Sequence, residues 1–581
     1  MASGKSRKRG VSWRLGAVVM VITIAAAGLV ARLVQLQVID HGQYAAEARD
    51  IHVAKETVTG RRGALLDRNG YPLAASKDTY DVMVETKAWK DANAANESAA
   101  AIAAVTNGDP KEMVSTVQGA EVYEIAVARG LEFEAASTIR ELGLRGVRLL
   151  RSSTRVHPEG NLAAQLLGFV GRDNTGLTGL EADLEALIGG ARDTVIFERD
   201  GLGNQLAVGD PNQRDPEPGS QVVLSIDRFV QRMAERELDR AIKDHKASGG
   251  TIIAVQPKTG EILAMASRPS FDITNPDLSD ESKLALFRNR AITDQYEPGS
   301  VFKLITAAAA VDLGLVNPNS WWYDAGVVNV DGWTIRNWDL SANGSQTVTQ
   351  ILAKSLNTGA AWLAQELGPE QFYDYIYKFG FGEASGSGLG GEVAGRVRTP
   401  ENDSANWRSV DMATNSFGQG ISVTPLQMVM AVAALANEGK LMKPMLVKEV
   451  IGPHDNEQVS EPEVARQVVS ADTARTLLDM MGVVVQGIPR SFLNIQGYEV
   501  GGKTGTANIA SATGSYKGTY ISSFIGVAPL EDPQLVILVK IDEPKDVAWG
   551  TVVAAPAFNR IAQAALAYFK IPPLEADIVR R

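Results

Sequence analysis

The sequence predicts an α+β fold, in which helices cover an antiparallel sheet. Strand-like apolar runs at 251–255 and 261–265 open the second half of the chain. A helical middle follows, and two more strand-like runs at 524–528 and 535–541 precede a final helix expected at 557–569. This layout favours a sheet with helices packed on its faces.

The composition limits the number of domains and the kinds of chemistry. With 581 residues the chain is too long for one core, so two or three domains are expected. The net charge of −11 argues against nucleic acid as a partner. The chain has no cysteine, which excludes disulfides, thiol catalysis and cysteine metal sites. We predict neither a metal nor a cofactor.

The N-terminus predicts a membrane anchor. Several basic residues precede an uncharged apolar run at 15–31, which is 17 residues long and near the lower limit for crossing a bilayer. The charge distribution predicts residues 1–14 in the cytoplasm, an anchor at 15–37 and everything beyond it outside the cytoplasm. A cleaved signal peptide is the alternative, because residues 25–27 are alanines. The apolar pattern continues through 33–36, which favours an uncleaved anchor.

Residues 38–216 carry no recognisable constellation of catalytic residues. An Asn-Gly pair at 69–70 predicts a hairpin turn, and an alanine-rich stretch at 93–105 predicts a helix. The acidic residues of this region are expected to form solvated faces, with catalytic pairs as the alternative. A charged, Pro-rich segment at 214–219 predicts the boundary with a second large region, 217–581.

The most informative motif of the second region is Ser300-x-x-Lys303, the only Ser-x-x-Lys in the chain. An alanine-rich run at 304–313 follows, so Ser300 is expected to open a buried helix with the Lys303 amine on the same face. A lysine, with a reference pKa of about 10.4, takes a serine proton only when it is neutral. Burial and the positive charge of Lys503 are expected to lower the pKa of Lys303. A helix N-terminus with an incidental lysine is the alternative.

A hydroxyl and an amide follow at the end of the next predicted helix. Residues 347–350 form a capping-box pattern, and the helix that they open ends near Ser355 and Asn357. Ser355 could relay protons, and Asn357 could hydrogen-bond a substrate amide. Ser-x-Asn also occurs at 341–343 and 404–406, and the helical setting of Ser355 favours it.

Lys-Thr-Gly occurs twice in the chain. The copy at 258–260 lies between two strand-like runs, where turn chemistry explains it. The copy at 503–505 precedes Thr506 and is predicted to lie on an edge strand whose glycines let a ligand approach closely.

Two rival chemistries are disfavoured. Residues 497–504 fit the Walker A pattern, but a phosphate cradle needs a helix directly after the lysine, and a Ser/Thr/Gly-rich segment at 511–519 follows instead. A Ser-His-Asp triad is not excluded by sequence distance, but no Gly-x-Ser-x-Gly elbow accompanies it. The histidines lie away from the serine motifs in sequence: His41, His52, His157, His245 and His454.

The order Ser300-x-x-Lys303, Ser355-x-Asn357, Lys503-Thr504-Gly505 resembles the signature of penicillin-binding proteins and serine beta-lactamases. The resemblance covers almost the whole chain. It favours division-type enzymes through 176–181 and Asp200-Gly201. Three further stretches look like class B transpeptidases: 62–70, 176–181 and 417–425.

The resemblance implies a peptidoglycan D,D-transpeptidase with an elongated pedestal of the dimerisation type at 38–216 and a transpeptidase domain at 217–581. It also implies roles for the motif residues. Ser300 would be the acylated nucleophile, Lys303 its base, and Ser355 and Asn357 the relay and substrate contact. Lys503, Thr504 and Thr506 would bind the substrate carboxylate, with Gly505 in the same substrate-binding strand, and the backbone N–H groups of Ser300 and Thr506 would form the oxyanion hole.

The partners implied are D-Ala-D-Ala stem peptides, an acceptor amine of a neighbouring stem peptide, and beta-lactams as covalent inhibitors. No motif resembles the glycosyltransferase module of class A enzymes, so a SEDS-type glycosyltransferase and divisome or elongasome proteins are expected partners. The alternatives are a D,D-carboxypeptidase or beta-lactamase of the same fold, and a penicillin-sensing protein. Septal and elongation roles stay open, as do the acceptor amine and the oligomeric state.

Four tryptophans lie between the first two motifs: Trp321, Trp322, Trp333 and Trp338. They could line a cleft for glycan or peptide, but a buried core is the favoured interpretation. The glycine-rich segment at 382–391 is expected to be a loop.

Overall fold

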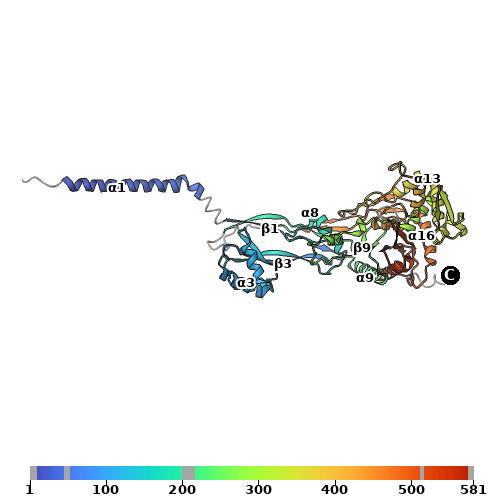
Figure 1. The fold of residues 1–581 in the computed structure, drawn as a ribbon, viewed down its shortest axis with the longest axis horizontal. Coiled ribbons are helices and arrows are strands. Elements are labelled where there is room, and N and C mark those ends of the chain that lie inside the picture. Colours follow the sequence, from blue (N-terminus) through green and yellow to red (C-terminus); the bar gives the residue numbers. More distant parts are fainter. Residues whose placement is uncertain (1–8, 45–52, 199–215, 511–515, 574–581) are drawn as a thin grey trace, which may run out of the picture. The chain divides into compact units, whose positions relative to one another are not determined.

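The computed structural model describes the chain apart from residues 1–8, 45–52, 199–215, 511–515 and 574–581 (Figure 1). Its contacts divide the chain into two units. The first unit comprises residues 1–60, 78–152 and 191–216, and the second comprises 61–77, 153–190 and 217–581. Asp200-Gly201, on which the division-type resemblance partly depends, lies outside the described residues.

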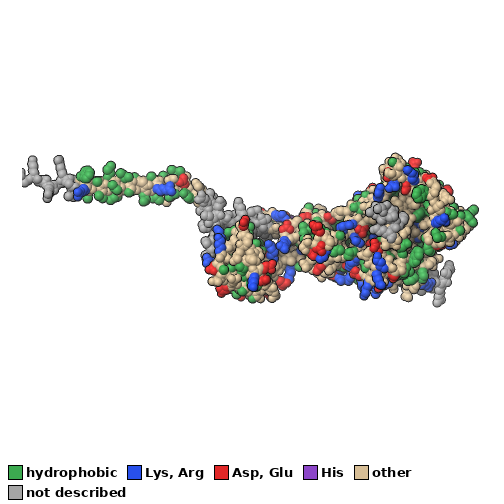
Figure 2. Space-filling model, viewed as in Figure 1, with side chains coloured by type: hydrophobic (Ala, Val, Ile, Leu, Met, Phe, Trp, Pro, Cys, Tyr) green, Lys and Arg blue, Asp and Glu red, His purple; other side chains and the backbone are tan. Residues whose placement is uncertain are grey.

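The first unit begins with a long apolar helix. α1 (Arg9–Val34) continues through a π-helical turn, η1 (Gln35–Ile39), and its side chains are mostly exposed. Among the described residues, Trp13–Ile39 is the one helix long and apolar enough to cross a membrane. Figure 2 shows hydrophobic side chains along its length. The apolar helix predicted at 15–37 is therefore present.

A small α+β body forms much of the rest of the first unit. Its helices are α3 (Ala92–Thr106), α4 (Pro110–Gln118) and α5 (Phe133–Glu141), and its strands are β3 (Pro72–Glu85), β4 (Glu124–Leu131) and β5 (Val147–Val156). Asp91 and Asp109 cap α3 and α4 by accepting hydrogen bonds from backbone N–H groups. α3 confirms the helix predicted at 93–105. β1 (Val53–Thr59) and β6 (Arg192–Glu198) pair separately as an antiparallel ladder.

The second unit contains a tight turn next to its first strands. β2 (Leu65–Leu66) pairs antiparallel with β3 and parallel with β7 (Gln221–Leu224). The buried Asp67 carboxylate closes the turn, accepting from the N–H groups of Asn69 at 2.8 Å and Tyr71 at 2.9 Å. The hairpin predicted at 69–70 is thus confirmed. Other short elements here are α6 (Ala164–Leu167), α7 (Gly179–Asp183), α8 (Glu185–Ile188), β15 (Val447–Ile451) and β16 (Glu457–Val459).

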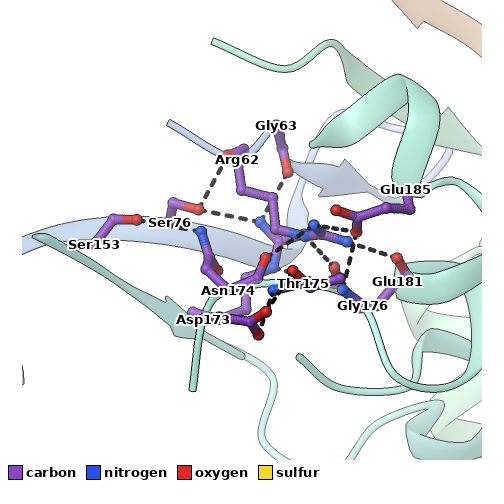
Figure 3. A network of polar contacts seen from close by, with 11 residues as sticks. Arg62, Gly63, Ser76, Ser153, Asp173, Asn174, Thr175, Gly176, Glu181 and Glu185 are labelled. Carbon is purple, nitrogen blue, oxygen red and sulfur yellow. Dashed lines mark hydrogen bonds and ion pairs between the residues drawn. The ribbon is translucent and has the colours of Figure 1, made fainter. Parts of the chain in front are cut away.

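The prediction that the acidic residues of this region are solvated is wrong for Glu181. Glu181 is buried between Arg62 at 2.6 Å and Arg155 at 2.7 Å. Arg62 also pairs with Glu185 at 2.6 Å (Figure 3). A buried carboxylate persists when it is paired and hydrogen-bonded. One ion-pair network therefore joins the 62–70 and 176–181 stretches.

The core of the second unit is a five-stranded antiparallel sheet of order β18-β19-β20-β8-β9. Its strands are β8 (Gly249–Val255), β9 (Ile262–Arg268), β18 (Gly501–Ala510), β19 (Tyr516–Ala528) and β20 (Leu535–Asp542). All eight residues of β20 are buried, because both faces of the sheet are covered. Ile537 and Val539 pack with α9 and α18, whereas Val536 and Leu538 face the other helices. The predicted α+β fold is confirmed.

Two helical layers cover this sheet. α15, whose residues are all buried, belongs to the larger layer. The helices are α9 (Arg228–His245), α10 (Arg290–Thr293), α11 (Lys303–Asp312), α12 (Val348–Ala353), α13 (Asn357–Lys378), α14 (Ser409–Asn415), α15 (Pro425–Leu435), α16 (Ala471–Gln486), α17 (Gly550–Val553) and α18 (Ala555–Tyr568). The 3₁₀ turns η2 (Glu281–Phe287) and η3 (Gly299–Phe302) accompany them. α18 confirms the final helix predicted at 557–569.

Three of the tryptophans between the first two motifs lie on small two-stranded ladders, and Trp338 lies in the turn after the strand that begins at Trp333. Trp321, Trp333 and Trp338 are 72%, 64% and 57% exposed, so the buried-core interpretation is wrong for these three. Trp322 is half-buried and stacks on Trp362. The ladders pair β10 (Trp321–Asp324) with β13 (Gly344–Thr347), β11 (Val327–Val330) with β12 (Trp333–Arg336), and β14 (Lys440–Met442) with β17 (Val464–Gln467).

Candidate active site

The segment with Ser300 is a 3₁₀ turn packed against a glycine. η3 precedes α11, so the α-helix begins at Lys303 and not at Ser300 as predicted. A 3₁₀ turn takes three residues, which places Ser300 and Lys303 on the same face. Gly299 has a φ of +60°, and a Cβ at Gly418 would lie 2.2 Å from the Gly299 oxygen. Glycine at 418 is therefore required for this approach.

The Lys303 amine is buried among three oxygens. Its Nζ lies 2.6 Å from the Ser355 carbonyl oxygen, 2.8 Å from Asn357 Oδ1 and 3.2 Å from Ser355 Oγ. Asn357 Nδ2 donates to the Arg336 carbonyl at 3.1 Å, which turns the amide oxygen toward the lysine. The structure thus brings Lys303, Ser355 and Asn357 together.

Ser355 lies at the junction of α12 and α13 in a left-handed conformation, with a φ of +57°. Such strain in a residue other than glycine costs on the order of 1–3 kcal/mol and is concentrated at functional sites. The capping box predicted at 347–350 is formed and fixes the start of α12. Ser355 Oγ lies 3.2 Å from Lys303 Nζ and 3.0 Å from Lys503 Nζ. One hydroxyl therefore connects two lysines.

The surroundings of both lysine amines lower their pKa values. Burial, and then the charge of Lys503, holds the pKa of Lys303 well below its usual range. Burial lowers the pKa of Lys503 to about 7. Removal from water disfavours an ammonium group, and a second cation adds to the effect. Near neutral pH this pair of lysines can therefore accept a proton.

β18 brings Lys503 to this cluster from the edge of the sheet, as predicted. A Cβ at Gly505 would lie 2.9 Å from a Val301 methyl and 3.0 Å from the Pro298 oxygen, so the glycine lets the strand lie against η3. Strand residues alternate in direction. Lys503 and Gly505 are buried, whereas Thr504 and Thr506 lie on the partly exposed face.

The structure argues against phosphate binding at the second Lys-Thr-Gly and gives the first one a turn. β18 continues to Ala510 after Lys503, so no helix N-terminus follows the lysine to bind a phosphate. The copy at 258–260 forms the turn between β8 and β9, as predicted, and Lys258 pairs with Asp532 at the surface.

A buried carboxylate that sequence reasoning missed lies next to Asn357. Asp324 accepts from Asn337 Nδ2 at 2.7 Å, from Asn343 Nδ2 at 2.8 Å and from Thr358 Oγ1 at 3.0 Å. Thr358 follows Asn357, and Asn337 follows the carbonyl to which Asn357 donates. Asp324 therefore fixes both segments around Asn357. No motif marks Asp324 in the sequence, although Asn343 belongs to one of the rejected Ser-x-Asn patterns.

Two family models match the chain. One, described as the penicillin binding protein transpeptidase domain, matches residues 250–563. The other, described as the penicillin-binding protein dimerisation domain, matches residues 57–224.

Similar proteins cover most of the chain. Stage V sporulation protein D of Bacillus subtilis is 36% identical over 526 residues, which cover 90% of this chain and 80% of that protein. Peptidoglycan D,D-transpeptidase FtsI of Escherichia coli is 31% identical over 582 residues, which cover 97% and 93%. The structure of penicillin binding protein 3 from Mycobacterium tuberculosis, complexed with aztreonam, matches with a TM-score of 0.68 and 26% identity, covering 89% of this chain and 98% of that one.

Proposed function

The chain belongs to the penicillin-binding transpeptidase family and is a serine-type peptidoglycan D,D-transpeptidase, and we propose that Ser300 is its acylated nucleophile. The observation that carries this proposal is the Ser355 hydroxyl, which lies within hydrogen-bond distance of both Lys303 and Lys503. A serine becomes a nucleophile when a neighbouring base takes its proton. The position of Lys303, one 3₁₀ turn after Ser300, supports its assignment as that base.

Acylation would proceed as a proton-coupled attack on the stem peptide. Ser300 Oγ attacks the carbonyl carbon of the penultimate D-alanine, and Lys303 Nζ takes the hydroxyl proton. The backbone N–H groups of Ser300 and Thr506 hold the developing oxyanion. The proton then passes through Ser355 to the leaving nitrogen, the amide C–N bond breaks, and D-alanine leaves an ester on Ser300.

The substrate peptide would bind along the exposed edge of β18. An extended peptide can add to a sheet edge through backbone hydrogen bonds. Thr504 and Thr506, which share the partly exposed face of the strand, hydrogen-bond the terminal carboxylate, and Lys503 attracts it when charged. Gly505 leaves room for the strand to lie beside η3, which places the scissile carbonyl beside Ser300.

Deacylation would form the cross-link. The amine of a neighbouring stem peptide attacks the Ser300 ester, a new amide bond forms, and the serine oxygen recovers its proton from the attacking nitrogen through Lys303. Attack by water would trim the peptide instead. The similarity to proteins named transpeptidases favours the amine over the D,D-carboxypeptidase and beta-lactamase alternatives.

The acylation rate is expected to fall as the pH drops. The reactive form is the one in which Lys303 is neutral, so the acylation rate should fall about 10-fold or more between pH 7 and pH 5 as the pair of lysines takes up a further proton. The rate constant for acylation by benzylpenicillin, measured from pH 5 to 9, checks this expectation. A flat profile, with thermal unfolding unchanged across the range, would contradict the assignment of the base.

Asp324 is expected to position Asn357 for the reaction. Asp324→Asn removes a buried acceptor and should slow acylation about 10-fold, because unmatched buried donors move the 336–337 and 357–358 segments. The acylation rate and its pH profile are the measurements, and the profile should keep its midpoint. Asp339→Asn is the matched control, because Asp339 caps Ser341 in an exposed loop. Equal rates in both variants would contradict the positioning role.

We also propose a septal role and an anchored topology. The similarity to FtsI and the 176–181 stretch support septal synthesis, with an elongation role as the alternative. The apolar helix α1 supports residues 1–14 as a cytoplasmic tail, 15–37 as the anchor, and 38–216 and 217–581 as extracytoplasmic pedestal and transpeptidase domains. A SEDS-type glycosyltransferase and division proteins would meet the anchor and pedestal.

The absence of cysteine makes this topology directly testable. In intact cells, a membrane-impermeant maleimide should label the Ser491→Cys variant, at an exposed loop position of the transpeptidase region, and should leave Ser3→Cys unlabelled. Labelling of both variants only after the cells are permeabilised would contradict the proposed orientation.

A further inference from the structure

The second unit contains a cavity outside the Ser300 site. It has a volume of about 480 Å³, within the usual range for small-molecule sites. The end of β5, the loop at 169–174 and the loop at 273–276 line it, and none of the residues assigned to transpeptidation belongs to this lining. Its side chains include Arg155, His157, Phe169, Arg172, Asn174 and Ile273.

Arg155 presents an unpartnered nitrogen beside this cavity. Its side chain is 2% exposed, and its Nε donates to Glu181 at 2.7 Å. Its Nη1 donates to the Gly63 carbonyl at 2.8 Å. Its Nη2 is buried and has no hydrogen-bond partner among the described residues. Leaving a buried N–H group without an acceptor costs free energy. This nitrogen can therefore donate a hydrogen bond to a ligand oxygen.

Two further polar atoms complete the lining. Asn174 Oδ1 is buried and accepts no hydrogen bond within the described part of the chain, while its Nδ2 contacts Ser153 at 3.4 Å (Figure 3). His157 Nε2 is also buried without a partner there. Burial and the neighbouring Arg155 lower the pKa of His157 to about 4, so the imidazole is neutral. The cavity therefore offers a fixed donor, a fixed acceptor and a neutral imidazole.

The charges and apolar groups around the cavity narrow the ligand class. No aspartate or glutamate lines it. Arg62 and Arg155 are balanced by Glu181 and Glu185, but the exposed Arg172 adds a positive charge. Phe169 and Ile273 supply an apolar wall. A ligand that fits carries an anionic group, an amide and a small aliphatic side chain.

We propose that this cavity binds a peptidic carboxylate, that is, an N-acylated amino acid or the C-terminal residue of a peptide. The ligand carbonyl accepts from Arg155 Nη2, its amide N–H donates to Asn174 Oδ1, and its carboxylate pairs with Arg172. This site is independent of the roles proposed for Ser300 and the two lysines.

N-acetylalanine is the smallest probe that carries all three groups. Its binding to the full-length protein in detergent is measured by calorimetry before and after reaction with benzylpenicillin. Benzylpenicillin blocks the Ser300 site, so any binding that remains is at another site. We expect millimolar or tighter binding that benzylpenicillin leaves unchanged. Acetate, which lacks the amide, and N-acetylalanine amide, which lacks the carboxylate, should each bind at least about 5-fold more weakly.

Two variants test the contacts without disturbing the ion-pair network. Asn174→Asp keeps the side-chain shape and an acceptor oxygen but adds a negative charge that repels the ligand carboxylate, and should weaken binding at least about 10-fold without lowering the melting temperature. Arg172→Gln should weaken it about 3-fold or more, whereas Arg145→Gln, an exposed arginine of the other unit, should not. The proposal would be overturned if N-acetylalanine did not bind at concentrations of about 10 mM, or if all variants bound it equally. The cavity would then hold only water.

Discussion

Ser300→Ala is expected to abolish covalent labelling by penicillin and to reduce cross-linking to background. Loss of a catalytic nucleophile removes a step that the remaining groups cannot replace, and costs on the order of a million-fold in comparable serine enzymes. The fold should survive, since Ser300 lies in a short 3₁₀ turn and is only half-buried. Gel fluorescence with a labelled penicillin and chromatography of cross-linked stem peptides measure the two effects.

Three other serines test the choice of the second motif. Ser355→Ala should slow acylation strongly, because it removes the hydroxyl shared by Lys303 and Lys503. Ser341→Ala and Ser404→Ala are matched controls from the other Ser-x-Asn patterns and should leave labelling intact. A loss of labelling in either control would overturn the assignment of Ser355.

Lys503→Met is expected to lower the acylation rate by about 100-fold or more. Methionine keeps the buried aliphatic volume but removes the amine that contacts Ser355 and that attracts the substrate carboxylate. The rate constant for acylation by benzylpenicillin is the measurement, with the melting temperature recorded in parallel.

Lys258→Met is the matched control, because Lys258 begins the other Lys-Thr-Gly of the chain. Its side chain lies at the surface beside Asp532, where an ion pair contributes about 0–1 kcal/mol. Its acylation rate should equal that of the parent protein. The reverse result, with slow acylation of the Lys258 variant and unchanged acylation of the Lys503 variant, would contradict the assignment of Lys503 to the site.

The strands of the sheet and the start of the helix before Ser355 followed from local sequence patterns, whereas the meeting of the motifs was implied only by the family resemblance. The glycines around Lys503 predicted an edge strand that a ligand approaches closely, whereas at Gly505 the structure places η3, a segment of the chain itself. The capping box at 347–350 fixed the start of α12, so the position of Ser355 near its end could be predicted from the helix that it follows. These features are determined by residues close together in the sequence, so they could be predicted from the sequence alone.

The features that could not be predicted depend on distant partners. Asp324 becomes part of the site only because Asn337, Asn343 and Thr358 fold around its carboxylate. Glu181 is buried because Arg62, more than a hundred residues away, meets it. Trp321 is exposed because its short ladder packs no core beneath that face, which its composition does not reveal.

The most direct test of Ser300 as the nucleophile is peptide-level mass spectrometry after incubation of the protein with a fluorescent penicillin. We expect one adduct, on the peptide that contains Ser300, which persists for many minutes because deacylation by water is slow in a transpeptidase. Rapid loss of that adduct would indicate a hydrolase. An adduct on another serine, or no adduct on a folded protein, would contradict the assignment of Ser300.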